Sequence, residues 1–505
     1  MRRPTVLHVT AAAAVLVTLS PLVYLGVRTA SAGAAQVWDI LARTRTLELS
    51  VASLGLAVAV AGTCMAVGIP LAWLATRAAV PGGRWWLVAL SLPLAIPSYV
   101  TAYTWLAAFP GLAGFWPAWA VLTLSCLPYV ILPVAAVLSR LDPAYDDVAR
   151  TLGDRGLRRF RRTTAPLVLP AAGAGGLLVA LYTLSDFGAV SLLRYDTFTR
   201  VIYTSYRAAF DRTSAAVLSL VLVALAAICI ILERRLRSSH QQWRVGGGSA
   251  RTAQRADLGP WRWPAFGLLA VVVALGVGFP SVMLGRLLLT SAGDGFTATS
   301  WVDAAINTTI AAGIGAVIAM LLATPIAVLA ARYRDRLART TESAAFISHA
   351  LPAVVVGLAL VFMGLTLFPQ LYQSLVMLGF AYAVLFLSNA IGSVRSATEQ
   401  VPPALEDVAR TLGDKPVQAW WKVTARISLP GILAGALLVL LTAMKELPAT
   451  LMLRPTGFDT LATEMWQQTS VAAFGQAAPY ALGLIVLAAV PAFILARLTT
   501  QKEAA

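Results

Sequence analysis

The sequence predicts an all-α membrane protein that crosses the bilayer about twelve times and consists of two parallel six-helix repeats. Of its 505 residues, 58% are hydrophobic and only 12% are charged, whereas a soluble domain is about 25% charged. Many apolar stretches reach the roughly 20 residues that a membrane span needs. One eight-residue segment, DVARTLGD, also occurs twice.

A segment in lipid must satisfy its own backbone groups, so we expect every span to be a helix. The predicted spans cover residues 6–27, 50–76, 86–108, 117–138, 167–185, 213–232, 264–288, 304–331, 343–367, 375–394, 430–451 and 475–496. The first apolar run follows Arg2 and Arg3 and could be a signal peptide. It is longer than a 7–15-residue signal core, which favours a retained span, although the Ala-rich stretch after it leaves cleavage open.

These spans divide the chain into two similar halves. A polar linker, residues 233–262, separates the halves and contains a Gly-Gly-Gly-Ser segment of flexible composition. We predict the following segments: an N-terminal helix with an external loop (1–46), a first transmembrane domain (47–232), the linker (233–262), a first helix of the second half (263–300), a second transmembrane domain (301–498) and a tail (499–505).

The halves are related by a sequence repeat. Residues 147–154 recur at 407–414, and the offset of 260 also carries Pro143 onto Pro403, Asp146 onto Glu406, Pro170 onto Pro430, Asp186 onto Glu446 and Arg194 onto Arg454. Earlier in each half the offset is 255, which places 70–77 on 325–332 and Pro97 on Pro352. Because each half has an even number of spans, the repeats are parallel and related by an axis along the membrane normal.

The net charge of +16 admits two explanations, nucleic-acid binding or positively charged cytoplasmic loops. If the DVARTLGD loops are cytoplasmic, the cytoplasmic segments hold 29 of the 39 Lys and Arg residues. External segments then hold 9, and Lys445 lies within a span. The asymmetry favours cytoplasmic N- and C-termini and no nucleic-acid partner.

Few residues suggest catalysis or cofactor binding. The sequence has no P-loop of the GxxxxGK[ST] type, so a partner must handle any ATP, and we expect no cofactor bound by this chain. The Cys and His residues show no metal-site spacing, and we expect the cysteines to be small core residues. They are Cys64, Cys126, Cys229, His8, His240 and His349.

Each DVARTLGD segment is predicted to form a short amphipathic helix that is too short to span. In the first copy Asp142 suits the N-cap, Pro143 the first helical position and Gly153 the C-terminal stop. The apolar faces comprise Tyr145, Val148, Ala149 and Leu152 in the first copy and Leu405, Val408, Ala409 and Leu412 before Gly413 in the second. Each face needs a partner protein, the membrane or its own bundle to cover it.

The repeated segment resembles the EAA-xxx-G loop of permeases of ABC importers. Asp147-Val148-Ala149 with Gly153, and Asp407-Val408-Ala409 with Gly413, match that loop, with Asp in place of Glu and Val in place of the first Ala. A Pro thirteen residues after the Gly is kept as Pro166 but replaced by Arg426. The resemblance implies ATPase-coupling loops made by Asp147, Val148, Ala149, Leu152, Gly153, Asp407, Val408, Ala409, Leu412 and Gly413.

The same resemblance implies the type I ABC importer (MetI-like) permease fold in a bacterial plasma membrane. It implies two copies of a separate ABC ATPase, which would use the ATP, and a soluble substrate-binding protein. The chain itself would be a transport subunit and not an enzyme. A twelve-span secondary transporter is the main alternative, but it would need no docking helices. An intramembrane enzyme would need clustered catalytic residues at membrane depth.

A narrower resemblance concerns the substrate. The segments 445–450 (KELPAT), 453–455 (LRP) and 457–462 (GFDTLA), together with Asp186-Phe187-Gly188, are similar to fused permeases of iron(III) importers. Relatives that import thiamine, phosphonates or polyamines share much of this architecture. Iron(III) is therefore the substrate that the resemblance implies, although no ligand set is visible in the sequence.

Three ionisable residues fall at or near membrane depth, where such groups usually face a cavity or a partner. They are Asp186, Lys445 and Glu446. Because Asp186 and Glu446 are repeat equivalents, one hypothesis is that they line the translocation pathway, where their oxygens would suit a hard cation. The alternative is structural: Glu446 pairs with Lys445 or Arg454, and Asp186 pairs with Arg194.

Overall fold

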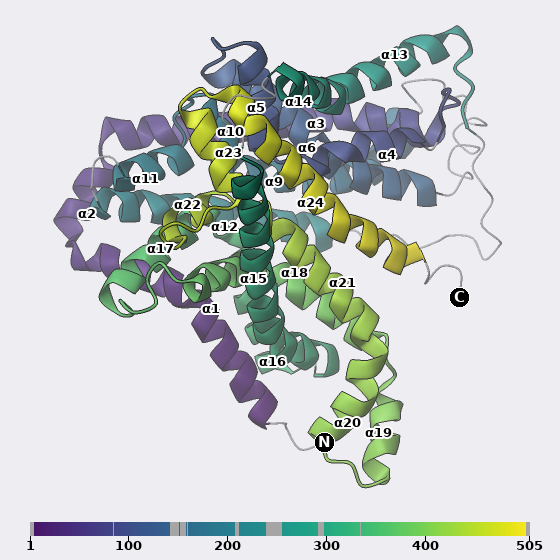
Figure 1. Cartoon of the computed structure of the whole chain (residues 1–505). Coiled ribbons are helices and arrows are strands. Elements are labelled where there is room, and N and C mark those ends of the chain that lie inside the picture. Colours follow the sequence, from purple (N-terminus) through teal and green to yellow (C-terminus); the bar gives the residue numbers. More distant parts are fainter. Residues whose placement is uncertain are drawn as a thin grey trace. The chain divides into compact units, whose positions relative to one another are not determined.

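A computed structural model describes residues 5–83, 85–141, 151, 158, 160–207, 212–238, 255–290, 297–333 and 335–500 (Figure 1). These residues are almost entirely helical. Their only extended pairing is an isolated bridge between Ala78 and Ala256. The all-α prediction is therefore confirmed for the described part of the chain.

Ten helical segments in the described residues are long and apolar enough to cross a membrane, or up to twelve if two bent pairs are counted as spans. The ten contain α1 (Thr5–Ser31), α3 (Thr44–Arg77), α6 (Phe115–Arg140), α9 (Ala165–Ser185), α12 (Arg212–Ser238), α13 (Arg262–Val273) continued by α14 (Phe279–Thr290), α15 (Ala298–Arg332), α18 (Leu375–Glu399), α21 (Ala425–Ala443) and α24 (Phe474–Thr500).

The predicted spans 86–108 and 343–367 are each bent. In the first, α4 (Trp85–Ser91) and its 3₁₀ extension meet α5 (Ser98–Ala108) at 87°. In the second, α16 (Arg336–Ala345) and its extension meet α17 (Ala353–Thr366) at 96°. Both breaks precede a proline, Pro97 or Pro352, which disfavours the α conformation of the residue before it. Ile96 and Leu351 accordingly have extended ψ values of 120° and 115°.

Shorter helices that the sequence did not predict connect the spans. They are α2 (Ala34–Leu41), α10 (Gly188–Leu192), α11 (Phe198–Arg207), α22 (Pro448–Leu453) and α23 (Leu461–Ser470). The predicted span 430–451 was too long, because α21 ends at Ala443 and the chain turns before α22. Pro448 lies at the start of α22, where its missing N–H costs no helical hydrogen bond.

The chain forms two compact units, and each contains a helix from the other half of the sequence. The first-half unit comprises residues 43–201 and 224–287, and the second-half unit comprises residues 1–42, 202–223 and 288–505. Helix α1 therefore belongs with the second half. Its Ala11 and Ala14 lie in one buried cluster with Ala319 and Ala323 of α15.

In the first-half unit, the helices that come from the other half of the sequence are α13 and most of α14. Trp86 of α4 meets Phe266 of α13 edge to face, with ring centroids 5.3 Å apart. Trp105 of α5 packs on Phe279 of α14, with ring centroids 4.1 Å apart. Aromatic pairs at these separations add stabilisation beyond area burial, so they help to hold the later helices on α4 and α5.

Small residues let the central spans of each unit approach closely. A Cβ on Gly315 of α15 would lie 2.6 Å from the Tyr382 Cβ of α18. A Cβ on Gly175 of α9 would lie 2.6 Å from the Tyr129 carbonyl oxygen of α6. Such glycines allow backbones to pack in membranes, where dispersion contacts drive helix association. These spans form the scaffold on which the candidate site is built.

Candidate functional site

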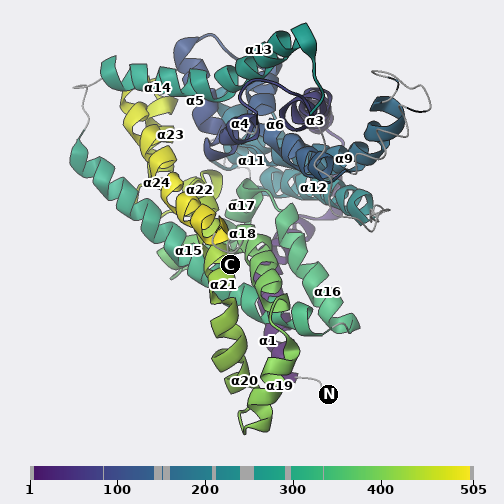
Figure 2. The same cartoon turned by 90° about the vertical axis from the view of Figure 1, so that its right-hand side faces the viewer.

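The second DVARTLGD segment forms a short helix outside the spans, as predicted. Helix α19 (Pro403–Thr411) follows α18, and α20 (Pro416–Ala419) with a π-helical turn (Trp420–Thr424) leads into α21. Figures 1 and 2 show α19 and α20 beyond the ends of α18 and α21. The helix begins with Pro403 at its first position, where a proline is well tolerated.

Gly413 follows the end of α19, as the stop predicted for the motif glycine requires. Its φ is +101°, a region in which a Cβ is costly. The Asp414 N–H donates to the Ala409 carbonyl, and the Gly413 N–H donates to the Arg410 carbonyl, both at 3.1 Å. These two bonds make a Schellman stop, which satisfies carbonyls at the helix end.

The apolar face of α19 lies largely exposed. Leu405 is 43% exposed, Val408 is 56% exposed and Leu412 is 83% exposed, whereas Ala409 is buried. The second-half unit therefore does not cover this face itself. An exposed apolar face of this kind is typical of a surface that another protein or the membrane covers.

Two ion pairs fix the ends of this segment. Arg332, the last residue of α15, donates to Glu406 in the first turn of α19 at 2.8 Å. Lys422, in the turn before α21, donates to Asp414 just after Gly413 at 2.5 Å. Helix α19 is thus held at its start by α15 and at its end by the approach to α21.

The first copy of the motif cannot be described in the same way. Asp147, Val148, Ala149, Leu152 and Gly153 lie outside the described residues. The described chain before them ends just after α6, at Leu141. There, Arg77 donates from Nε to the Leu138 carbonyl and from Nη2 to the Leu141 carbonyl, both at 2.9 Å.

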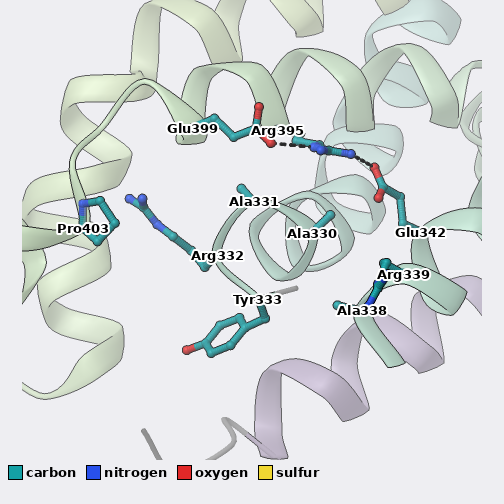
Figure 3. A pocket seen from close by; sticks show the side chains of 10 residues that line it. All are labelled: Ala330, Ala331, Arg332, Tyr333, Ala338, Arg339, Glu342, Arg395, Glu399 and Pro403. Atoms are coloured by element: carbon teal, nitrogen blue, oxygen red, sulfur yellow. Dashed lines mark hydrogen bonds and ion pairs between the residues drawn. The ribbon is translucent and has the colours of Figure 1, made fainter. Parts of the chain in front are cut away.

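A cavity of about 710 Å³ lies beside α19 in the second-half unit (Figure 3). Its walls come from the end of α15, from α16, from the end of α18 and from Pro403. Arg395 extends between Glu399, at 2.8 Å, and Glu342. The ring of Tyr333 lies in the lower part of Figure 3. Burial raises the pKa of this tyrosine. The cavity therefore has a polar wall with three arginines (Arg332, Arg339 and Arg395) and two glutamates (Glu342 and Glu399).

Asp186, in the first-half unit, is a buried cap between α9 and α10. Its Oδ1 accepts hydrogen bonds from the N–H groups of Ala189 (3.0 Å) and Val190 (3.3 Å). Its Oδ2 accepts the Ser98 hydroxyl at 2.5 Å. The carboxylate thus satisfies N–H groups at the start of α10 and ties that helix to α5, where Ser98 lies.

Glu446, in the second-half unit, plays the same structural part before α22. Its Oε1 accepts from the Ala449 N–H (2.8 Å), and its Oε2 accepts from the Thr450 N–H (2.9 Å) and the Thr450 hydroxyl (2.5 Å). The hydrogen bonds of Glu446 therefore go to a helix start, whereas Arg454 pairs with Asp459. A pathway role for Asp186, Lys445 and Glu446 stays a prediction.

Sequence reasoning missed Arg332, Thr424 and Ser98. A signal for Arg332 was present, because the 255-residue offset places Arg332 on Arg77.

The cysteines agree with the prediction of core positions: Cys64 and Cys126 are buried and Cys229 is half-buried. Within the described residues, no group of three His, Cys, Asp or Glu side chains could hold a metal ion.

Comparison with known proteins identifies the family. The model of the "Binding-protein-dependent transport system inner membrane component" family matches residues 68–239 and 323–501. The chain belongs to this family. The two matched segments fall in the two halves of the sequence, so this inner membrane component carries the family domain twice in one polypeptide.

Individual relatives agree with this assignment. The Fe(3+)-transport system permease protein FbpB 2 of Haemophilus influenzae is 33% identical over 482 residues, which is 94% of this chain and 94% of the relative. The sulfate transport system permease protein CysT of Salmonella typhimurium is 28% identical and covers 46% of this chain and 91% of its own length. The molybdenum transport system permease protein ModB of Mycobacterium bovis is 32% identical over 27% of this chain and 55% of the relative.

Membership of this family confirms the predicted permease fold with two repeats. It sets aside the secondary transporter and the intramembrane enzyme. The chain is a membrane component of a transport system that depends on a binding protein, and the relatives above are permeases of transport systems.

Proposed function

We propose that this chain is the permease of an ATP-driven iron(III) importer and forms the path for iron(III) delivered by a soluble binding protein. One observation carries the choice of substrate. The similarity to the Fe(3+) permease extends over 94% of both chains, whereas the sulfate permease CysT matches 46% of this chain. The Fe(3+) permease is therefore the relative that matches both halves of this chain, and its substrate is the one we propose.

The two DVARTLGD loops are the proposed docking sites for the ATPase, one copy under each loop. The support is the exposed face of α19, formed by Leu405, Val408 and Leu412, and the occurrence of the same eight residues in the first half. The sequence has no P-loop, so ATP hydrolysis belongs to the partner.

The proposed orientation places both termini and both DVARTLGD loops in the cytoplasm. The support is the charge distribution, with 29 of 39 Lys and Arg residues on that side. Short loops with excess positive charge stay cytoplasmic. The ATPase would then meet α19 where ATP is available.

Deletion of the gene tests the substrate. Iron(III) uptake by cells should fall and should return when the intact gene is supplied. Uptake of thiamine, phosphonate, a polyamine, sulfate and molybdate is measured in the same cells. Intact iron(III) uptake with loss of one of these substrates would move the chain to that transport system.

A further inference from the structure

Arg332 joins the docking helix to two spans of its own unit. Its Nη1 donates to the Val401 carbonyl and its Nη2 donates to Glu406 Oε1, both at 2.8 Å. Nη2 also donates to the Thr424 hydroxyl at 3.3 Å, and that hydroxyl donates to the same Glu406 oxygen. Three side chains therefore connect the end of α15, the first turn of α19 and the residue before α21.

This group of contacts is shielded from water. The side chains of Arg332 and Glu406 are 11% and 21% exposed, and Thr424 is fully buried. Low local dielectric strengthens hydrogen bonds to charged groups. In contrast, the pair between Arg410 and Asp407 on the same helix is about half exposed, with 3.5 Å between its atoms. Exposed pairs of that kind contribute little.

The remainder of α19 has few other attachments. Its apolar side chains are mostly exposed, and Ala409 is its only buried residue. Figure 3 shows Arg332 reaching from the end of α15 toward Pro403, at the start of α19, and away from Glu342. A displacement of α19 would therefore reach α15 through Arg332 and α21 through Thr424.

The first half has one of these contacts at the equivalent arginine. Arg77 donates to the Leu141 carbonyl, as Arg332 donates to the Val401 carbonyl. Leu141 and Val401 are 260 residues apart, the offset that relates the two DVARTLGD segments. An arginine that binds the chain just before each loop is therefore common to both halves.

We propose that Arg332, Glu406 and Thr424 form a coupling triad, which holds α19 on α15 and α21 so that movement of a docked ATPase reaches the spans. The proposal rests on the proposed function, because it needs α19 to be a docking helix. The three residues are positioning residues, and their role is to transmit motion.

The test compares iron(III) uptake with ATP hydrolysis in liposomes that contain the chain, its ATPase and its binding protein. The variants are Glu406→Gln and Arg332→Lys. Glu406→Gln keeps the shape and removes the charge, and Arg332→Lys keeps the charge and removes the forked geometry. Both should reach the membrane and co-purify with the ATPase at wild-type levels. Uptake per ATP hydrolysed should fall about threefold or more.

Glu399→Gln is the matched control, because it removes a carboxylate from another ion pair with Arg395 on α18. It should leave the ratio unchanged. The double variant Arg332→Glu with Glu406→Arg should take up more iron(III) per ATP hydrolysed than either single variant. Thr424→Val removes both hydroxyl contacts at similar volume and decides the question if the charge variants do not accumulate.

An unchanged ratio in Glu406→Gln, Arg332→Lys and Thr424→Val would overturn the coupling triad. So would a loss of ATPase co-purification in these variants, because the residues would then only shape the docking surface. Failure of the wild-type chain to bind the ATPase would instead overturn the proposed function, and the triad with it. The wild-type control distinguishes these two outcomes.

Discussion

The His8 imidazole in α1 lies with its Nε2 3.2 Å from Asp335 Oδ2, although 327 residues separate them. Asp335 also accepts the Ala338 N–H at 2.9 Å and so caps α16. The start of the chain is thus bound to a helix cap in the second half of the sequence. Together with the burial of Ala11 and Ala14, this contact makes α1 part of the second-half unit.

Enlarging the buried face of α1 should destabilise the protein. Ala11 is fully buried against α15, so Ala11→Leu should cost about 1–3 kcal/mol through overpacking. The measurement is the midpoint of thermal unfolding in detergent. Val9→Leu is the control, because Val9 is 62% exposed. Equal midpoints for the two variants would contradict the packing of α1.

The glycine after α19 should be needed for its backbone conformation. A Cβ at Gly413 or at Gly392 of α18 meets no atom within 4 Å, but only Gly413 has a positive φ, +101°. Gly413→Ala should therefore strain the end of α19 by about 1–2 kcal/mol, and both ATPase association and uptake should fall. Gly392→Ala, the matched control, should retain both. Wild-type association in Gly413→Ala would show that the stop is dispensable.

Helix capping and charge can be separated at the two buried carboxylates. Asp186→Asn with Glu446→Gln removes both charges and keeps one accepting oxygen at each position. That oxygen can still accept both N–H groups of α10, which share Oδ1 of Asp186, but only one of the two N–H groups of α22, which bind different oxygens of Glu446. If the carboxylates line the pathway, this double variant should reach the membrane and bind the ATPase, but uptake should fall about tenfold or more.

Retained uptake in that double variant would assign both residues to capping alone. Asp186→Ala with Glu446→Ala is the companion variant. It removes the caps, each worth about 0.5–2 kcal/mol, and should lower the amount of folded protein under either explanation.

One chain should bind two ATPase subunits, because the DVARTLGD segment occurs twice. The mass of the purified assembly, measured by light scattering or native mass spectrometry, gives the ratio directly. A single ATPase per chain would mean that only one loop docks. Leu412→Asp, at a side chain that is 83% exposed, should weaken binding at the second loop without unfolding the unit.

Local sequence signals predicted the spans and helix α19 well. Apolar runs set the spans because lipid leaves a lone segment no other hydrogen-bond partners, and Gly413 set the end of α19 because few other residues tolerate its φ. The bends at Pro97 and Pro352 were present in the sequence as an aligned proline pair, yet hydropathy alone counts each bent pair as one span.

Long-range relationships were beyond these signals. Nothing in the composition of α1 indicates that it packs in the second-half unit, because an apolar helix suits either half. The capping roles of Asp186 and Glu446 depend on the short helices α10 and α22, which start just after these residues. The contact between Arg332 and Glu406 depends on the approach of α15 to α19, although the repeat marks Arg332 as the counterpart of Arg77.

Transport in a purified system tests the central claim most directly. Liposomes that contain the chain and its ATPase, with ATP inside and the iron(III)-loaded binding protein outside, are assayed for iron accumulation. We expect accumulation that requires both ATP and the binding protein and that stops when ATP is replaced by a non-hydrolysable analogue. No accumulation of iron(III), with ATP-dependent accumulation of another substrate on its own binding protein, would contradict the assignment as an iron(III) importer.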